Sequence, residues 1–315
     1  MSHHFGTIGV VGTGVIGASW TALFLARGLK VIVSDPAPGA SEKLAAFLEK
    51  EWPTMEKLGL SEGASLENYK FVPSIDPYLE EIDILQENAP ERLEFKRQLF
   101  AHLDANTPKE TLLLSSSSGL PASKFVTDCK NNPSRILIGH PFNPPHLVPL
   151  VEVVPHPATG DAYAAKAMEF YKFLGKSPVL VKKETPGFIA NRLQAALCKE
   201  AYSLVERGII SASDLDTTVT SGVGLRWALT GPFMTNTLGG GGSFKHFMDH
   251  LGPALQSWDG DMQENAFDFS SEKFESLGAS VQEWMDKVDV DAVAKERDDF
   301  LLQFIEAKSK ATTLK

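Results

Sequence analysis

The pattern of apolar residues predicts alternating strands and helices over the first part of the chain. A short apolar run at residues 7–11 is followed by glycines, and a second run at residues 31–33 ends at Asp35. Between the two runs, apolar residues recur at the spacing of one helix face: Ile16, Trp20, Leu23 and Phe24. Gly28 is placed to end that helix. Strand, glycine turn, helix and strand in this order form one βαβ unit.

The alternation continues as far as residue 181. Apolar positions at helical spacing predict one long helix or two over residues 41–58, and further helices at 91–103 and 163–174. Short apolar runs predict strands at residues 82–86, 112–114, 136–138, 151–154 and 178–181. Strands that alternate with helices are typical of a mostly parallel sheet covered by helices on both faces. The sequence therefore predicts an α/β fold of the Rossmann type.

The pattern changes after residue 186. Apolar residues recur at helical spacing over residues 188–207, and residues 211–214 have the composition of an N-cap for a further helix. We predict no further strand. The chain is therefore expected to divide into a Rossmann-type domain, residues 1–186, and an all-helical domain, residues 187–315.

Three glycines stand between the first predicted strand and the first predicted helix, in the arrangement G-x-G-x-x-G. Gly12 permits a tight turn, Gly14 lets the backbone approach a pyrophosphate, and Gly17 lets the helix pack closely on the strand. The N–H groups at the helix N-terminus favour an anion at this point. With a strand before it and a helix after it, the motif predicts a dinucleotide site; the alternative is a glycine turn that binds nothing.

Asp35 stands at the end of the second predicted strand, roughly 20 residues after Gly17. A carboxylate in this place hydrogen-bonds the ribose hydroxyls of NAD and repels the 2′-phosphate of NADP. Residues 36–38 contain no arginine to hold that phosphate. We therefore predict NAD as the cofactor.

Composition and charge narrow the class of protein. The chain has 315 residues, of which 43% are hydrophobic and 22% charged, as in an ordinary folded protein of about two domains. The formal net charge of −10 disfavours nucleic acids and anionic membranes as partners. No apolar run reaches the roughly 20 residues that cross a membrane.

Cysteine usage and the N-terminal residues indicate a reducing compartment. The two cysteines, Cys129 and Cys198, suggest neither a disulfide framework nor a thiolate zinc site, and no group of His, Cys and Asp has metal-ligand spacing. Residues 1–5 run straight into the first predicted strand and leave no room for a secretory signal. We expect a cytoplasmic protein without a bound metal.

A histidine and a carboxylate are candidates for acid–base chemistry. His140 follows the predicted strand 136–138, and the carboxyl ends of parallel strands face the ligand crevice. Glu152 lies inside an apolar run, where a carboxylate is costly unless it is paired, and a histidine is a suitable partner. Such a dyad can remove the proton of a secondary alcohol while its hydride leaves for nicotinamide. Serines at residues 115–118 offer hydroxyls to the same crevice. The alternatives are a loop histidine and a structural ion pair.

Taken together, these motifs resemble the 3-hydroxyacyl-CoA dehydrogenase family along almost the whole chain. The resemblance is carried by the glycine motif and by residues 115–119, 140–144, 152–154 and 185–192. A closer likeness to the branch with short substrates, which includes L-gulonate 3-dehydrogenase (lambda-crystallin) and bacterial L-carnitine 3-dehydrogenase, is carried by residues 90–94, 150–157 and 222–228.

The resemblance implies an enzyme that uses NAD to oxidise the 3-hydroxyl of a small hydroxy acid, similar to L-gulonate, to the 3-keto acid. L-Carnitine and a 3-hydroxyacyl-CoA are the alternative substrates. In this family His140 corresponds to the general base and Glu152 to the residue that holds it. Ser118 corresponds to the serine that hydrogen-bonds the substrate oxygen, with Ser117 as a fallback, and Asn191 completes the polar cluster.

Further positions follow from the same resemblance. Glu91 and Lys96 correspond to residues beside the nicotinamide ribose, and Val15 and Ile16 lie at the pyrophosphate turn. Asn143, in the same motif as His140, is expected to contact substrate. For Lys96 the alternative is a solvated helix face.

The substrate carboxylate needs a cationic partner. Arg226 is a candidate because a guanidinium can hold a carboxylate in two parallel hydrogen bonds; the alternative is a structural arginine. The trimethylammonium of carnitine would need an aromatic or acidic cage. Three aromatic residues could form such a cage or a helical core: Trp227, Phe233 and Phe244.

Two non-enzymatic functions compete with this interpretation: a structural protein of the crystallin type, and a module that senses NAD without turnover. The chain keeps all four candidate catalytic residues, which argues against a loss of catalytic activity: Ser118, His140, Glu152 and Asn191. The resemblance also implies a homodimer formed through the helical domain.

Overall fold

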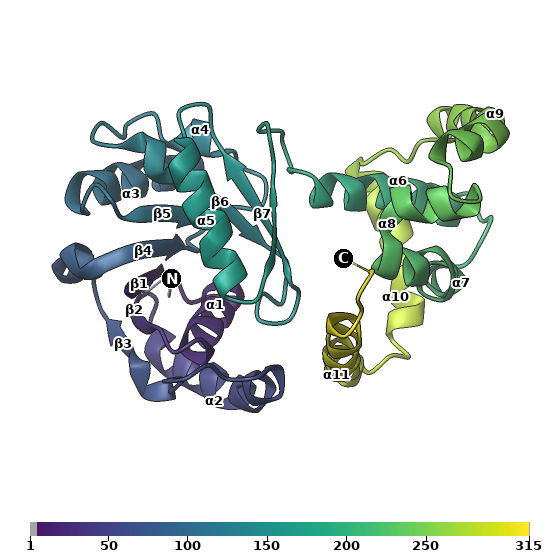
Figure 1. The fold of residues 1–315 in the computed structure, drawn as a ribbon. Helices are drawn as coiled ribbons and strands as arrows, with labels where there is room; N and C mark the ends of the chain where they lie inside the picture. Colours follow the sequence, from purple (N-terminus) through teal and green to yellow (C-terminus); the bar gives the residue numbers. More distant parts are fainter. Residues whose placement is uncertain (1–4, 315) are drawn as a thin grey trace. The chain divides into compact units, whose positions relative to one another are not determined.

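The fold comes from a computed structural model, which describes residues 5–314, apart from the side chain of Ser280. Contacts along the chain define two compact units, Met1–Arg192 and Leu193–Lys315 (Figure 1). The domain boundary that we predict from the sequence, between residues 186 and 187, lies a few residues before the division between the units and stays a prediction.

The first unit is built on one sheet of eight strands with the order β3-β2-β1-β4-β5-β6-β7-β8. All neighbouring strands run parallel except β6 and β7, which are antiparallel. The predicted mostly parallel sheet is thus confirmed. The strands are β1 (Thr7–Val11), β2 (Lys30–Ser34), β3 (Tyr69–Val72), β4 (Ile82–Glu87), β5 (Leu112–Ser115), β6 (Ile136–Pro141), β7 (Leu150–Pro155) and β8 (Ser177–Leu180).

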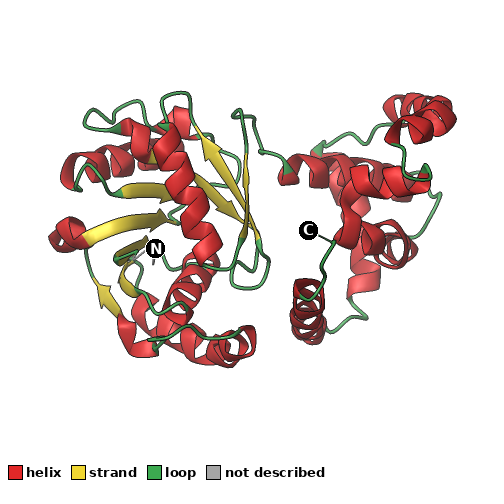
Figure 2. Ribbon diagram, viewed as in Figure 1, coloured by secondary structure: helices red, strands yellow, loops and turns green. Residues whose placement is uncertain are grey.

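Helices cover both faces of this sheet (Figure 2). One hydrophobic cluster joins the sheet to α1 (Val15–Ala26), α2 (Ala40–Leu58) and α5 (Asp161–Phe173), and a second joins it to α3 (Leu93–Asn106) and α4 (Ala122–Phe125). Alternate residues of one strand enter different clusters, as Val31 and Ile32 of β2 do, because successive side chains point to opposite faces. Short 3₁₀ turns complete the unit: η1 (Leu66–Asn68), η2 (Asp76–Glu81) and η3 (Pro133–Arg135).

The predicted elements occur with small shifts, and the edge strand β3 and the short helix α4 were not predicted. The four residues of β3 mix aromatic and charged side chains and so lack a clear apolar run. The predicted apolar residues of α1 lie in the core, and the burial of α1 extends to all its sides over residues 17–26. The cause is that α1 packs against the sheet, α2 and the aromatic rings of α5. Gly28 follows α1 with a φ of 75°, as expected of a residue that ends a helix.

The second unit is helical throughout its described residues (Figure 2). Helix α6, which leads into this unit, begins at Ala190 and not at residue 188 as predicted, because Phe188 has a positive φ of 49°. Ser211 caps α7 by accepting a hydrogen bond from the Asp214 N–H, as predicted. The elements are α6 (Ala190–Glu206), α7 (Ala212–Thr218), the π-helical turn η4 (Val219–Val223), α8 (Gly224–Gly239), α9 (Phe244–Glu264), α10 (Ser271–Met285) and α11 (Val290–Ser309). None of the described helices combines the length and apolar character of a membrane span.

Candidate active site

The glycine turn joins β1 to α1 with the geometry that a dinucleotide site requires. Gly12 has a φ of 87°, and a Cβ there would lie 2.8 Å from the carbonyl oxygen of Asn88. A Cβ on Gly17 would lie 1.9 Å from the carbonyl oxygen of Gly12, so the helix can approach the turn only without a side chain. Gly14 faces open space, and no acidic residue occupies the first turn of α1. The residues present therefore fit a bound pyrophosphate, with Val15 exposed beside it.

Asp35 is held against this turn. Its Oδ2 accepts hydrogen bonds from the backbone N–H of Thr13 at 2.6 Å and from the Thr13 hydroxyl at 2.9 Å, and its Oδ1 accepts one from Ala37 N–H at 2.8 Å. Burial raises the pKa of the Asp35 carboxyl, but the hydrogen bonds from Thr13 and Ala37 outweigh burial and hold the pKa below its usual value. A charged carboxylate thus stands at the end of β2. The contact with Thr13 was not predicted from the sequence.

His140 and Glu152 face each other across the antiparallel pair β6–β7. Nδ1 of His140 lies 2.8 Å from Oε2 of Glu152, and both side chains are buried. The sequence predicted that His140 follows the strand. It lies instead inside β6, because the pairing of β6 with β7 continues through this residue. The rings of Phe142 and Phe188 pack against the imidazole, with centroids 4.8 and 5.6 Å away.

The second oxygen of Glu152 binds the beginning of α6. Its Oε1 accepts hydrogen bonds from the backbone N–H groups of Ile189 and Ala190, both at 2.9 Å. Burial raises the pKa of the Glu152 carboxyl, but hydrogen bonds from His140, Ala190 and Ile189 outweigh burial and hold the pKa below its usual value. A charged carboxylate only accepts, so Nδ1 of His140 is the donor. In the neutral imidazole Nε2 then keeps a lone pair, and among the described residues it has no hydrogen-bond partner.

The serine segment divides into buried and exposed residues. Ser117 is 2% exposed, and its hydroxyl donates to Oε1 of Glu91 at 2.5 Å. Ser118 is exposed, and its backbone carbonyl accepts a hydrogen bond from Nδ2 of Asn191 at 2.8 Å. The structure thus brings Ser118 and Asn191 together, while the hydroxyl of Ser117 is engaged elsewhere.

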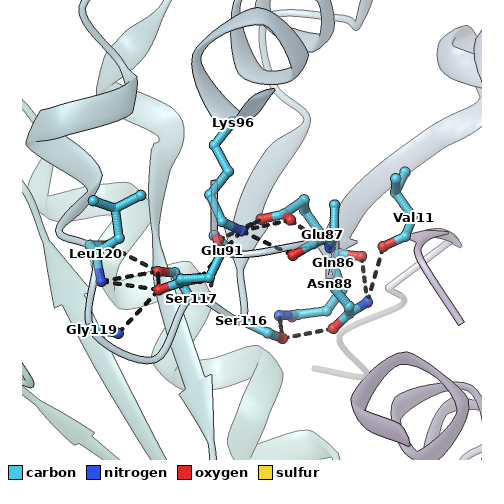
Figure 3. A network of polar contacts seen from close by, with 12 residues as sticks. Val11, Gln86, Glu87, Asn88, Glu91, Lys96, Ser116, Ser117, Gly119 and Leu120 are labelled. Carbon is cyan, nitrogen blue, oxygen red and sulfur yellow. Dashed lines mark hydrogen bonds and ion pairs between the residues drawn. The ribbon is translucent and has the colours of Figure 1, made fainter. Parts of the chain in front are cut away.

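Lys96 is enclosed between carboxylates (Figure 3). Its Nζ donates to Oε1 and Oε2 of Glu87 at 2.7 and 2.8 Å and lies 3.8 Å from Oε2 of Glu91. The side chain is 1% exposed, so the alternative of a solvated helix face is wrong. The side chain of Glu91 is 41% exposed, and it can reach a ligand where Lys96 cannot. Glu87 was not predicted from the sequence, because it stands between Gln86 and Asn88 at the end of β4, outside the apolar run.

A second polar group links the carboxyl ends of β1, β4 and β5 (Figure 3). The Ser116 hydroxyl accepts from Nε1 of Trp20 at 3.1 Å and from Nε2 of Gln86 at 2.8 Å, and it donates to Oδ1 of Asn88 at 2.7 Å. The backbone N–H of Asn88 donates to the carbonyl of Val11 at 2.7 Å. Ser116 therefore stabilises the sheet edge below the glycine turn and has no hydroxyl proton left for a ligand.

Two predicted site residues lie apart from these contacts. Asn143 is exposed in the connection between β6 and β7. Arg226 is exposed on α8, in the other compact unit, so its proposed contact with a carboxylate stays a prediction. In the described part of the chain no group of His, Cys, Asp and Glu side chains could hold a metal ion.

A Rossmann-type sheet with a glycine turn, a carboxylate after the second strand and a buried His–Glu pair has the architecture of a dehydrogenase that uses a nicotinamide cofactor. Comparison with family models supports this class of protein. Residues 7–185 match the model of the 3-hydroxyacyl-CoA dehydrogenase NAD binding domain, and residues 187–269 match that of the C-terminal domain. The chain belongs to the 3-hydroxyacyl-CoA dehydrogenase family and is an NAD-dependent oxidoreductase of that type.

Curated relatives resemble the chain over nearly its full length. A 3-hydroxyacyl-CoA dehydrogenase of Gibberella moniliformis is 50% identical over 100% of this chain and 98% of its own length. An L-carnitine dehydrogenase of Streptomyces coelicolor is 42% identical over 96% of this chain and 95% of its own length. Among solved structures, a 5-formyl-3-hydroxy-2-methylpyridine 4-carboxylic acid 5-dehydrogenase, described as an NAD⁺-dependent dismutase, superposes with a TM-score of 0.78 at 27% identity and covers 98% of this chain and 100% of its own.

Proposed function

We propose that this protein oxidises the 3-hydroxyl of a small free hydroxy acid to the 3-keto acid, and that L-carnitine is the first substrate to test. The observation that carries the reaction is the His140–Glu152 pair, in which Nε2 of a buried imidazole keeps its lone pair. His140 lies near the carboxyl end of β6, and the glycine turn follows the carboxyl end of β1 in the same sheet.

The reaction removes one proton and one hydride from the substrate. Nε2 of His140 takes the proton of the 3-hydroxyl while the C3–H bond gives up its hydride, and the product is a ketone. The chemistry that NAD supplies when bound is acceptance of that hydride. Glu152 stabilises the imidazolium that forms and keeps the ring oriented. Ser118 donates a hydrogen bond to the substrate oxygen, and Asn191 holds the backbone of Ser118.

Two substrate classes have support from relatives. L-Carnitine dehydrogenases at 42% identity over most of the chain favour a free acid, and the exposed Arg226 is the residue that we assign to its carboxylate. The relative at 50% identity, a 3-hydroxyacyl-CoA dehydrogenase, favours a CoA thioester as the second candidate. Both are better supported than L-gulonate, the substrate expected first from the sequence.

The test is a screen of NAD⁺ reduction with L-carnitine, 3-hydroxybutyryl-CoA, L-gulonate and 3-hydroxybutyrate. We expect turnover with one of the first two, and His140→Ala should lower kcat by about 10²–10⁴-fold while NADH still binds. Turnover that survives the loss of His140 would refute its role. A protein that binds NADH but turns over no hydroxy acid would support the sensing module, and one that binds no NADH would support the structural protein.

The homodimer is a further part of the proposal. In the described part of the second unit, the buried apolar side chains are Ala201, Phe267 and Leu277, whereas large apolar side chains on α8, α9 and α11 are exposed. Phe233, the most exposed of them at 74%, illustrates the pattern. So much exposed apolar surface marks an interface, and we assign it to a second copy of the chain.

A further inference from the structure

The loop that carries Ser118 is held by one carboxylate. Oε1 of Glu91 accepts hydrogen bonds from the Ser117 hydroxyl at 2.5 Å, from Gly119 N–H at 3.2 Å and from Leu120 N–H at 3.1 Å. The Ser117 oxygen also accepts a hydrogen bond from Leu120 N–H at 3.2 Å. We call these four contacts the Glu91–Ser117 clamp. Figure 3 shows the carboxylate of Glu91 pointing into the loop between β5 and α4.

The clamp encloses Ser118 without touching its side chain. The residues on either side of Ser118, Ser117 and Gly119, both donate to Glu91. From the other direction, the amide of Asn191 donates to the Ser118 carbonyl. The backbone of Ser118 is therefore fixed from both sides, and its hydroxyl, which has no hydrogen bond among the described residues, is free for a ligand.

The carboxylate of Glu91 is itself anchored. Nζ of Lys96 lies 3.8 Å from its Oε2, and Lys96 is held in turn by the buried Glu87. Burial raises the pKa of the Glu91 carboxyl, but the hydrogen bond from Ser117 and the charge of Lys96 outweigh burial and hold the pKa below its usual value. A charged carboxylate is a stronger acceptor than a neutral one, so the clamp is made of charge-assisted hydrogen bonds.

We propose that Ser117 and Glu91 are positioning residues that fix Ser118 against the substrate oxygen. The proposal rests on the function proposed above, in which Ser118 touches substrate. It gives Glu91 a role on the serine loop that is separate from any contact with a cofactor ribose. Ser117, almost wholly buried, acts only through its neighbour. Displacement of a positioned group by about 1 Å can cost up to two orders of magnitude in rate, so the loss of the clamp should be visible in kcat.

A double-mutant cycle tests this dependence. The variants are Ser117→Ala, Ser118→Ala and the double variant, and kcat is measured at saturating NAD⁺ and hydroxy acid. We expect Ser117→Ala to lower kcat about tenfold in the wild-type background and less than twofold in the Ser118→Ala background, because a positioning residue has no effect once its target is gone. Equal effects in both backgrounds, or an unchanged kcat in either single variant, would overturn the proposal.

Cofactor binding separates the clamp from a ribose contact. Ser117→Ala should leave the Kd for NADH within about twofold, since its side chain is almost wholly buried; a loss of NADH affinity that equals the loss of kcat would contradict the proposal. Ser123→Ala, on the following helix α4, is the matched control, and its kcat and Kd should equal those of the wild type. If Ser117→Ala does not fold, Glu91→Gln takes its place in the cycle.

Hydrogen exchange tests the clamp without turnover. The amide protons of Gly119 and Leu120 both donate to Glu91, so Glu91→Ala, which removes their shared acceptor, should speed their exchange at least tenfold. Unchanged exchange would show that no clamp exists, whatever the kinetics. A wild-type protein without turnover on any hydroxy acid would refute the proposed function instead, and with it the role of Ser118.

Discussion

Nδ1 of His140 lies 2.8 Å from the Glu152 carboxylate because the two residues are direct partners in the antiparallel pair β6–β7. Both side chains thus project from the rigid part of the sheet, and neither depends on a loop for its position. The same carboxylate binds the first N–H groups of α6, so one residue connects the candidate base to the helix that follows the sheet.

Glu152→Gln should damage catalysis more than folding. The amide can donate to Nδ1 of His140, which would favour the tautomer with the proton on Nε2 and so remove the base. We expect kcat to fall by about 10²–10⁴-fold, with the Kd for NADH unchanged. Steady-state kinetics together with NADH fluorescence check this, and a kcat within threefold of the wild type would exclude the proposed role of Glu152.

Asp35→Ala should weaken NAD⁺ binding and relax the preference over NADP⁺. The substitution removes the carboxylate that repels a 2′-phosphate, and we expect roughly a tenfold rise in the Kd for NAD⁺ with a smaller change for NADP⁺. Thr13→Val is the matched control, because it removes only the hydroxyl that donates to Asp35. Identical affinities for both cofactors in wild type and Asp35→Ala would show that Asp35 does not contact the ribose.

Lys96→Met should be strongly destabilising. It leaves the carboxylate of Glu87 buried without its cation, and breaking a buried ion pair on one side typically costs about 3–5 kcal/mol. The double variant Glu87→Gln/Lys96→Met should recover much of that loss, since neither charge remains. Urea unfolding measures both free energies. A single variant as stable as the wild type would mean that the pair contributes nothing.

Lys176 should make stability depend on pH. Burial, assisted by the charge of Arg27, lowers the pKa of Lys176 to about 7, whereas an unfolded lysine titrates near pH 10.4. Between these values the unfolded chain binds more protons than the folded one, so this residue makes the free energy of unfolding rise with pH, by at most about 1.4 kcal/mol per unit. Below pH 7 the contribution of Lys176 to the free energy of unfolding does not change with pH. The measurement is urea unfolding from pH 6 to 10, with Lys176→Met as reference; parallel profiles would contradict the prediction.

The exposed aromatic residues of the second unit should control association. Phe233→Asp combined with Phe300→Asp places charges on surface that we assign to the dimer, and we expect monomers in sedimentation velocity at concentrations where the wild type is dimeric. Phe95→Asp, at an exposed phenylalanine on α3 of the first unit, is the control and should remain dimeric. A wild-type protein that sediments as a monomer would refute the homodimer.

Local pattern determined the order of strands and helices, the glycine turn and the identity of the chemical groups. These features depend on neighbours in the sequence, because the periods of two and 3.6 residues and the spacing G-x-G-x-x-G are local. Gly12, Gly14 and Gly17 could thus be placed before the fold was known, and so could His140 and Glu152 as polar residues next to or inside apolar runs.

Tertiary structure alone decided which of these groups meet. The antiparallel direction of β7 places Glu152 opposite His140, and strand direction follows from pairing between segments, which no local pattern records. Packing of α3 on the sheet buried Lys96 against Glu87, where the sequence left open a solvated face. The different surroundings of Ser117 and Ser118 also depend on packing, since only the folded loop turns one hydroxyl toward Glu91 and leaves the other residue exposed.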